Sequence, residues 1–142
     1  MIRARLALCL FLAACAPEAP GDTIPWTIER VVDGDTVAAG GYRIRLLGIQ
    51  APELRGVCEA EKALGRQARD RLAEIIAAGR VVELRRGPPG KYSQLTAWLV
   101  IDGEDAGQRL IAEGLAVPYQ GGTRPGWCGQ QNTARTDPRR KV

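Results

Sequence analysis

The sequence predicts a small α+β domain, mostly β, in which five short strands form a barrel accompanied by one long and one short helix. Two observations predict it. Short β-rich segments are separated by turns that contain glycine, and the one long helical pattern stands between the third and fourth segments. A length of 142 residues favours one domain. Aromatic residues make up only 5% of the chain, so aliphatic side chains must form the core.

The turns between the expected strands are specific. Asp33-Gly34-Asp35 is a turn signal, and Gly40-Gly41 suits a two-residue hairpin because both residues tolerate positive φ. Gly87-Pro88-Pro89-Gly90 ends the fourth strand, and Asp102-Gly103 turns the chain after the fifth. The expected strands are Trp26 to Val32, Thr36 to Ala39, Tyr42 to Leu47, Val81 to Arg85 and Leu95 to Ile101.

The long helix is expected over Cys58 to Ala78, with Gly79 at its end. Its apolar residues fall on one face: Leu64, Ala68, Leu72, Ile75 and Ile76. Asp105 can cap a short helix over Ala106 to Glu113, which Gly114 ends. Three strands, a long helix, two strands and a short helix match an OB-type barrel.

The first residues are expected to be an export signal rather than part of the fold. Arg3 and Arg5 precede an apolar run, Leu6 to Ala14, that is too short to span a bilayer. The run ends in Leu12-Ala13-Ala14-Cys15, which looks like a bacterial lipobox. Residues 1–14 are therefore predicted to be a lipoprotein signal peptide, Cys15 the lipidated residue and residues 15–24 a tether.

The expected location follows from that signal. Lipidation at Cys15 implies a cell-envelope protein anchored to a membrane, and Ala16 after it favours the periplasmic side of the outer membrane. A plain secretory signal with an incidental cysteine is the alternative, and it implies a secreted protein. No protein partner is predicted.

Export changes what the cysteines are expected to do. Cys58 and Cys128 remain after Cys9 leaves with the signal and Cys15 takes the lipid, and in an oxidising compartment they are expected to pair. Two free thiols are the alternative. The folded domain is placed at residues 25–128 and a disordered basic tail at residues 129–142.

Charge and composition exclude several functions. The net charge is +4, but the body from Cys15 to Thr133 carries about −1, so the folded part is not a broadly basic nucleic-acid surface. The chain contains no histidine, which excludes Ser-His triads and histidine metal sites. Any catalysis must use carboxylates, arginines, lysines, tyrosines or a metal.

Three segments carry the candidate chemistry, and a fourth follows the short helix. They are Val31 to Val37 (VVDGDTV), Arg43 to Glu53 (RIRLLGIQAPE), Lys91 to Leu95 (KYSQL) and Gly114-Leu115-Ala116. In this order and spacing they resemble the staphylococcal nuclease (thermonuclease) family from about Trp26 to Tyr119. The resemblance implies the OB-type fold and phosphodiester hydrolysis of DNA or RNA with a calcium ion.

The resemblance also implies roles for single residues. Asp35 matches a metal-binding carboxylate, and Ala51 matches a residue whose backbone carbonyl binds the metal; calcium prefers such oxygen ligands. Arg45 matches the first phosphate-binding arginine, because a guanidinium binds phosphate at two points. Glu53 matches the glutamate that acts on the attacking water. Without such a site, Asp35 would be an Asx-turn residue and Arg45 a solvent-facing strand residue.

Two positions depart from the family pattern. Gln50 stands where the family has a second metal-binding aspartate, so calcium binding is expected to be weak. Gln94 stands where the family has a second catalytic arginine, and losing such a charge costs on the order of 10²–10³ in rate. Arg86, Lys91 or Arg124 could compensate if a loop brings one of them to the site. Lys91 and Tyr92 match residues that bind the terminal phosphate of a nucleotide, and Tyr119 matches a base-stacking tyrosine.

The sequence therefore leads to a calcium-dependent nuclease of reduced activity as the first hypothesis. The second is an OB module that binds a nucleotide or oligonucleotide without cutting it. The third is an envelope domain with a structural or protein-contact role, which the low aromatic content favours.

Overall fold

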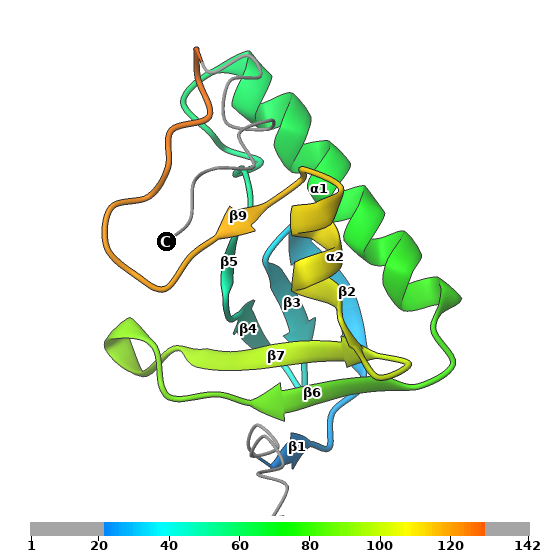
Figure 1. The fold of residues 1–142 in the computed structure, drawn as a ribbon. Helices are drawn as coiled ribbons and strands as arrows, with labels where there is room; N and C mark the ends of the chain where they lie inside the picture. Colours follow the sequence, from blue (N-terminus) through cyan, green and yellow to red (C-terminus); the bar gives the residue numbers. More distant parts are fainter. Residues whose placement is uncertain (1–21, 130–142) are drawn as a thin grey trace, which may run out of the picture.

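The computed structural model describes residues 22–129 as one curled sheet with two helices and a separate strand pair (Figure 1). The predicted signal, Cys15 and almost all of the expected tail lie outside the described residues. The larger sheet is seven-stranded and runs in the order β1-β6-β7-β4-β3-β2, with β8 paired to β7. The described α+β architecture confirms the predicted fold class.

The five predicted strands all form. They are β2 (Ile28–Asp33), β3 (Thr36–Ala39), β4 (Tyr42–Leu46), β6 (Val82–Arg86) and β7 (Leu95–Ile101). β4 and β7 pair in parallel, and the other neighbours in the main path are antiparallel. Figure 1 shows β6 and β7 crossing β2, β3 and β4 at a steep angle. The pairing among the described residues is an open path, consistent with a partly open OB-type barrel.

Four two-residue strands were not predicted, because such segments show no periodicity. β1 (Thr23–Ile24) pairs with β6, and Ile24 lies in the core, so the tether expected at residues 15–24 extends two residues too far. β5 (Ile49–Gln50) pairs with β9 (Val117–Pro118), and β8 (Glu104–Asp105) extends the β7 edge.

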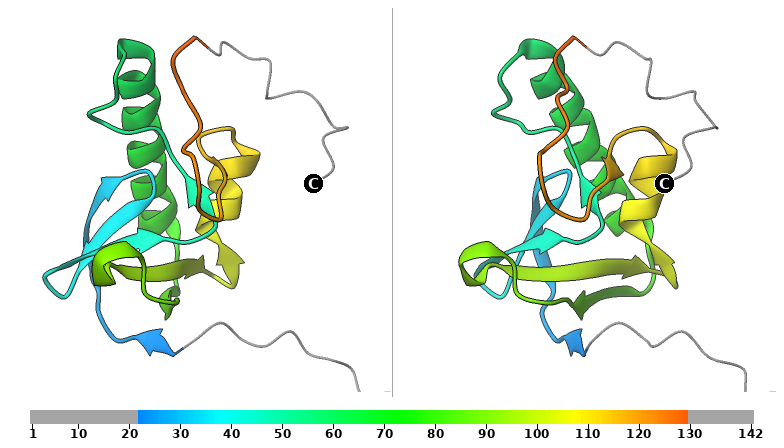
Figure 2. Two further views of the ribbon diagram at one scale, coloured as in Figure 1. Left: turned by 90° about the vertical axis from the view of Figure 1, so that its left-hand side faces the viewer. Right: turned by 60° about the vertical axis from the view of Figure 1, so that its left-hand side comes forward.

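Both predicted helices form, with Gly79 and Asp105 as the expected caps, whereas Cys58 and Glu113, expected inside the helices, are caps. α1 (Glu59–Ala78) begins after Cys58, whose sulfur accepts a hydrogen bond from the backbone of Glu61, and α2 (Ala106–Ala112) begins after Asp105. Figure 2 shows α1 along the sheet and α2 beside β5 and β9. α1 buries Ala68, Leu72 and Ile75 in the single core cluster. Within residues 22–129, neither helix combines the length and the apolar character that crossing a membrane requires.

Asp102 ties the turn after β7 to the segment after α1. Its carboxylate accepts hydrogen bonds from the backbone of Val81 at 2.9 Å and of Arg80 at 3.1 Å. These bonds hold the pKa of Asp102 below its usual 3.8.

The variant Asp102→Asn is expected to lose less stability than wild type as the pH is lowered into the acid range. A carboxyl whose pKa is lower in the folded state contributes stability above its unfolded pKa and loses it as pH falls through the folded pKa. Melting temperatures of wild type and Asp102→Asn, followed by circular dichroism from about pH 6 to about pH 2, test this. The wild type should lose more stability than the variant over that interval. Parallel curves would contradict the assignment.

The predicted disulfide is present between Cys58 and Cys128, whose Cα atoms are 6.0 Å apart across 70 residues of sequence. Closing a loop of that length corresponds to about 4 kcal/mol in the chain-entropy model. Residues 119–129 are largely exposed, so a protein without the bridge can release this segment while the core stays folded. The free energy of unfolding of Cys58→Ser/Cys128→Ser is therefore expected to fall by less than that value.

Urea unfolding measured by circular dichroism tests this. Serine is chosen because it is itself a good helix N-cap and preserves the start of α1. A loss of about 4 kcal/mol, the full loop-closure value, would show that residues 119–129 stay packed on the domain without the disulfide.

Candidate active site

The Asp33-Gly34-Asp35 turn is packed too tightly for any residue but glycine at its centre. A Cβ on Gly34 would lie 2.6 Å from the Cβ of Ala68 on α1 and 2.8 Å from that of Ala51. This close approach fixes Asp35, which is 4% exposed, at the inner end of a cleft. One carboxylate oxygen of Asp35 accepts from the Ala51 backbone N–H at 3.0 Å, and the other accepts from Thr36 Oγ1 at 3.0 Å.

Arg45 extends from β4 toward Asp35 and is held on several sides. Its Nη1 lies 3.3 Å from Asp35 Oδ1, and its Nη2 donates to Gln50 Oε1 at 2.7 Å. The ring centroid of Tyr119 lies 6.0 Å from the guanidinium carbon. Arg45 is thus pre-oriented. Binding a phosphate would therefore cost this side chain little further rotamer freedom.

Gln50 forms two contacts that no carboxylate could form together. It is 2% exposed; its oxygen accepts from Arg45, and its Nε2 donates to the backbone carbonyl of Ala51 at 3.0 Å. An amide both accepts and donates, whereas an ionised carboxylate only accepts. Gln50 is therefore fully engaged in linking Arg45 to Ala51.

The hydrogen bonds and the charges of these residues determine how well they could bind the calcium ion that the resemblance implies. Of the three residues that the resemblance assigns to the metal, Asp35 alone carries a charge. The oxygens of Gln50 and Ala51 already accept hydrogen bonds. Calcium takes six to eight oxygen ligands and binds more tightly as their charge increases, so the residues present fit calcium poorly.

Glu53 lies on a loop that rests directly on α1. A Cβ on Gly65 would lie 2.8 Å from the carbonyl carbon of Glu53, so only glycine permits this contact in mid-helix. The carboxylate of Glu53 pairs with the guanidinium of Arg124, which comes from the segment after β9. Both side chains are about half exposed, at 46% and 56%.

Of the three cations that the sequence offered as compensation for Gln94, namely Arg86, Lys91 and Arg124, the structure brings Arg124 alone to the lining of the cleft. The predicted disulfide contained the signal for it. Cys58 follows Glu53 by five residues and Cys128 follows Arg124 by four, so pairing the cysteines brings the two charged side chains together.

A cleft of about 510 Å³ is lined by Asp35, Arg45, Glu53 and Arg124 among others. Five guanidinium groups and three carboxylates line it, a net charge of +2, although the body of the chain as a whole is slightly acidic. The cleft is therefore suited to an anion. Its charged lining residues are Arg30, Asp33, Asp35, Arg43, Arg45, Glu53, Arg55 and Arg124.

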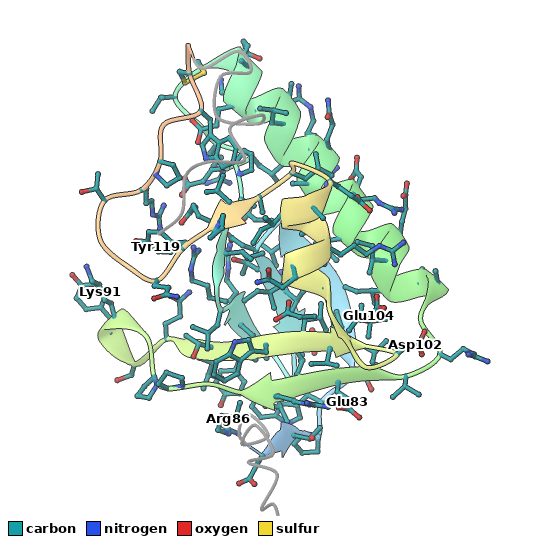
Figure 3. The ribbon with its side chains drawn as sticks, viewed as in Figure 1. Glu83, Arg86, Lys91, Asp102, Glu104 and Tyr119 are labelled. Carbon is teal, nitrogen blue, oxygen red and sulfur yellow. A yellow bond between two sulfur atoms is a disulfide. The ribbon has the colours of Figure 1, made fainter. Side chains whose placement is uncertain are left out.

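The structure does not bring the Lys91 to Gln94 segment into this cleft. Lys91, Tyr92 and Gln94 are exposed on and after the 3₁₀ turn η1 (Lys91–Ser93), and none lines the cleft. In Figure 3, Lys91 extends outward from this turn on the side of the molecule where Tyr119 lies. Asp35, Arg45, Gln50, Ala51, Glu53 and Tyr119 are the sequence candidates that the fold brings together through the contacts described above.

A curled OB-type sheet with an arginine-lined cleft beside Asp35 and Glu53 defines a nuclease-like domain. The comparison with family models agrees: the staphylococcal nuclease homologue family matches residues 43–137. The chain belongs to this family.

Three curated relatives are similar over part of their length. Endonuclease YncB of Bacillus subtilis (strain 168) is 30% identical over 96 residues, which are 63% of this chain and 46% of the relative. The SPbeta prophage-derived endonuclease YokF of the same organism is 32% identical over 96 residues, 63% of this chain and 32% of the relative. The succinoglycan biosynthesis protein ExoI of Rhizobium meliloti (strain 1021) is 27% identical over 112 residues, 75% and 59% respectively. The chain thus spans less than two thirds of each relative.

Proposed function

We propose that this domain hydrolyses phosphodiester bonds of DNA or RNA, at a rate reduced by the Gln50 and Gln94 departures. One observation carries the proposal: Arg45, pre-oriented by Asp35, and Glu53 line the same positively charged cleft. The names of two relatives, both endonucleases, support it.

The residues of the cleft would divide the work. Arg45 binds the non-bridging oxygens of the phosphate and stabilises the charge that grows on them in the transition state. Glu53, half exposed at the cleft, holds a water molecule and accepts its proton as the water oxygen attacks phosphorus. The bond from phosphorus to the leaving oxygen of the substrate breaks, and that oxygen takes a proton from solvent. Tyr119, beside Arg45, offers a ring face for a base of the substrate.

We propose only weak calcium binding, in the range of about 10⁻⁴–10⁻³ M that is typical of sites with few charged ligands. Asp35 and the carbonyl of Ala51 would hold the ion.

A binding module without hydrolysis is the second candidate, and the hydrogen bonding of Gln50 favours it. Gln50 holds the Ala51 carbonyl and Arg45 in a fully bonded arrangement that is complete without a metal. Such a site would retain a phosphate-binding guanidinium while lacking a charged metal site.

The test is hydrolysis of single-stranded DNA, with calcium or with EDTA, by wild type and by Glu53→Gln. The glutamine has the same shape and can still bond to Arg124, but it accepts no proton at neutral pH. Cleavage by wild type that falls by about 10²-fold or more in the variant would support the enzyme. Salt-dependent binding without cleavage by a folded wild type would establish the binding module instead.

We further propose that the protein is exported and anchored to the cell envelope through a lipid on Cys15. The disulfide supports export, because such bonds persist in oxidising compartments. Mass spectrometry of the protein from the membrane fraction of its own host tests it: a diacylglyceryl group on Cys15 is expected, and an unmodified Cys15 would contradict it.

A further inference from the structure

We propose that Arg124 is the second phosphate-binding guanidinium of this site, replacing the charge that Gln94 lacks, and that the Cys58–Cys128 disulfide holds it there. The inference rests on the proposed function, since it names a further residue for the same phosphodiester cleft. Three features carry it: the position of Arg124, the attachment of its segment and the chemistry of its present partner.

Position favours Arg124 over Gln94. Arg124 lines the cleft together with Arg45, whereas Gln94 is exposed beside η1 and does not line it. Arg124 contacts the carboxylate of Glu53, the group proposed to act on water. A guanidinium beside that carboxylate can reach a phosphate that is bound by Arg45 and attacked by the water that Glu53 holds.

The segment that carries Arg124 is attached at both ends. At its start, the Tyr119 backbone N–H donates to the Gly48 carbonyl at 2.9 Å, and Tyr119 Oη donates to the Gly122 carbonyl at 2.8 Å. At its end, Cys128 is bonded to Cys58 at the start of α1. Figure 1 shows this segment, in orange, leaving β9 and passing outside β5 to the start of α1. The disulfide is therefore a covalent restraint on its far end.

The present partner of Arg124 is one that a phosphate can displace. The pair with Glu53 is half exposed, and exposed ion pairs are weak. A phosphodiester offers the guanidinium two oxygens in the same fork geometry as a carboxylate. Moving Arg124 from Glu53 to the phosphate also frees Glu53 to hold water. The ion pair is thus the resting state of both groups.

The experiment measures oligonucleotide binding and hydrolysis separately, with the full-length chain. A fluorescent single-stranded oligodeoxynucleotide is titrated in EDTA at several salt concentrations, and hydrolysis is followed without EDTA. The variants are Arg124→Ala, Arg124→Lys and Cys58→Ser/Cys128→Ser. Arg86→Ala is the matched control: it removes the same charge at an exposed position on β6 that does not line the cleft and that Figure 3 shows below Tyr119.

Loss of one phosphate contact is expected to reduce the slope of log affinity against log salt by about 0.7 for a single strand. Arg124→Ala should show this reduction together with a fall in hydrolysis of about 10²-fold. Arg124→Lys should keep the slope but cleave more slowly, because an ammonium lacks the two-point geometry. Arg86→Ala should match wild type. The double serine variant should behave like Arg124→Ala, and adding Arg124→Ala to it should cause little further loss.

Several results would overturn the proposal. An unchanged slope and rate in Arg124→Ala would show that the arginine binds only Glu53, and faster hydrolysis would show that it blocks the site. An equal loss of binding and hydrolysis in Arg86→Ala would show that the effect comes from net charge and not from the position of Arg124. If wild type binds but does not cleave, the proposed hydrolysis is wrong. The salt slope of Arg124→Ala then still tests whether Arg124 binds phosphate. If wild type shows no binding at low salt, both proposals fall.

Discussion

Arg45→Lys is expected to lower phosphodiester hydrolysis by about 10²–10³-fold, the effect of removing one well-placed charge stabiliser. The guanidinium of Arg45 contacts both Asp35 and Gln50, and the residue lines the cleft. A lysine ammonium keeps the charge but is a single point, so it cannot bond to Asp35, Gln50 and a phosphate in the same geometry. The substitution should also lower stability by about 1–3 kcal/mol, because a buried hydrogen bond to a charged group is lost.

Arg43→Lys is the matched control for stability, and Arg86→Lys, which lies outside the cleft, is the matched control for cleavage. Arg43 lies two residues earlier on β4, is 63% exposed on its side chain and pairs with Asp33 at 3.5 Å. Its replacement is expected to change stability by no more than about 0.5 kcal/mol, as at an ordinary surface position. Single-turnover cleavage and urea unfolding of all three variants separate catalysis from folding. If a folded Arg45→Lys cleaves at the wild-type rate, Arg45 serves only to neutralise Asp35.

Gln50→Asp is expected to tighten calcium binding by about tenfold or more. The substitution adds a second carboxylate beside Asp35 and removes the amide that now donates to the Ala51 carbonyl, so that carbonyl becomes available to a cation. Arg45 keeps a charged acceptor in the variant. Without calcium, the added buried charge should lower the melting temperature, and calcium should restore it in proportion to the affinity gained.

Isothermal titration calorimetry and melting temperatures at increasing calcium concentration measure this directly, without relying on cleavage. Gln94→Asp is the control, since it adds the same charge at an exposed position outside the cleft. Its calcium affinity should equal that of wild type. If Gln50→Asp binds calcium as weakly as wild type, the geometry of the ligand oxygens, and not their charge, limits the calcium affinity.

Local signals were sufficient for the elements of this fold. Thr36–Ala39 and Leu95–Ile101 form with the predicted bounds, because alternating or β-rich segments were closed by turns that tolerate positive φ. Gly40 and Gly41 indeed have φ of 58° and 77°. Of its predicted apolar stripe, α1 buries Ala68, Leu72 and Ile75 and packs Ile76 against the core, whereas Leu64 lies outside the core cluster. β1 was missed because a two-residue strand shows no pattern, and only its pairing with β6 defines it.

The sequence by itself determined the family, the order of the elements, the turn at Asp35 and the pair of cysteines, since each depends on residues close together in the chain or on residue type alone. The tertiary structure decided which charges meet. Glu53 and Arg124 are 71 residues apart, and Asp35 accepts a hydrogen bond from the backbone N–H of Ala51, which lies 16 residues away in the sequence. Contacts of this kind depend on how distant segments pack, and in a cleft such packing determines which charges are neutralised and which remain for a substrate.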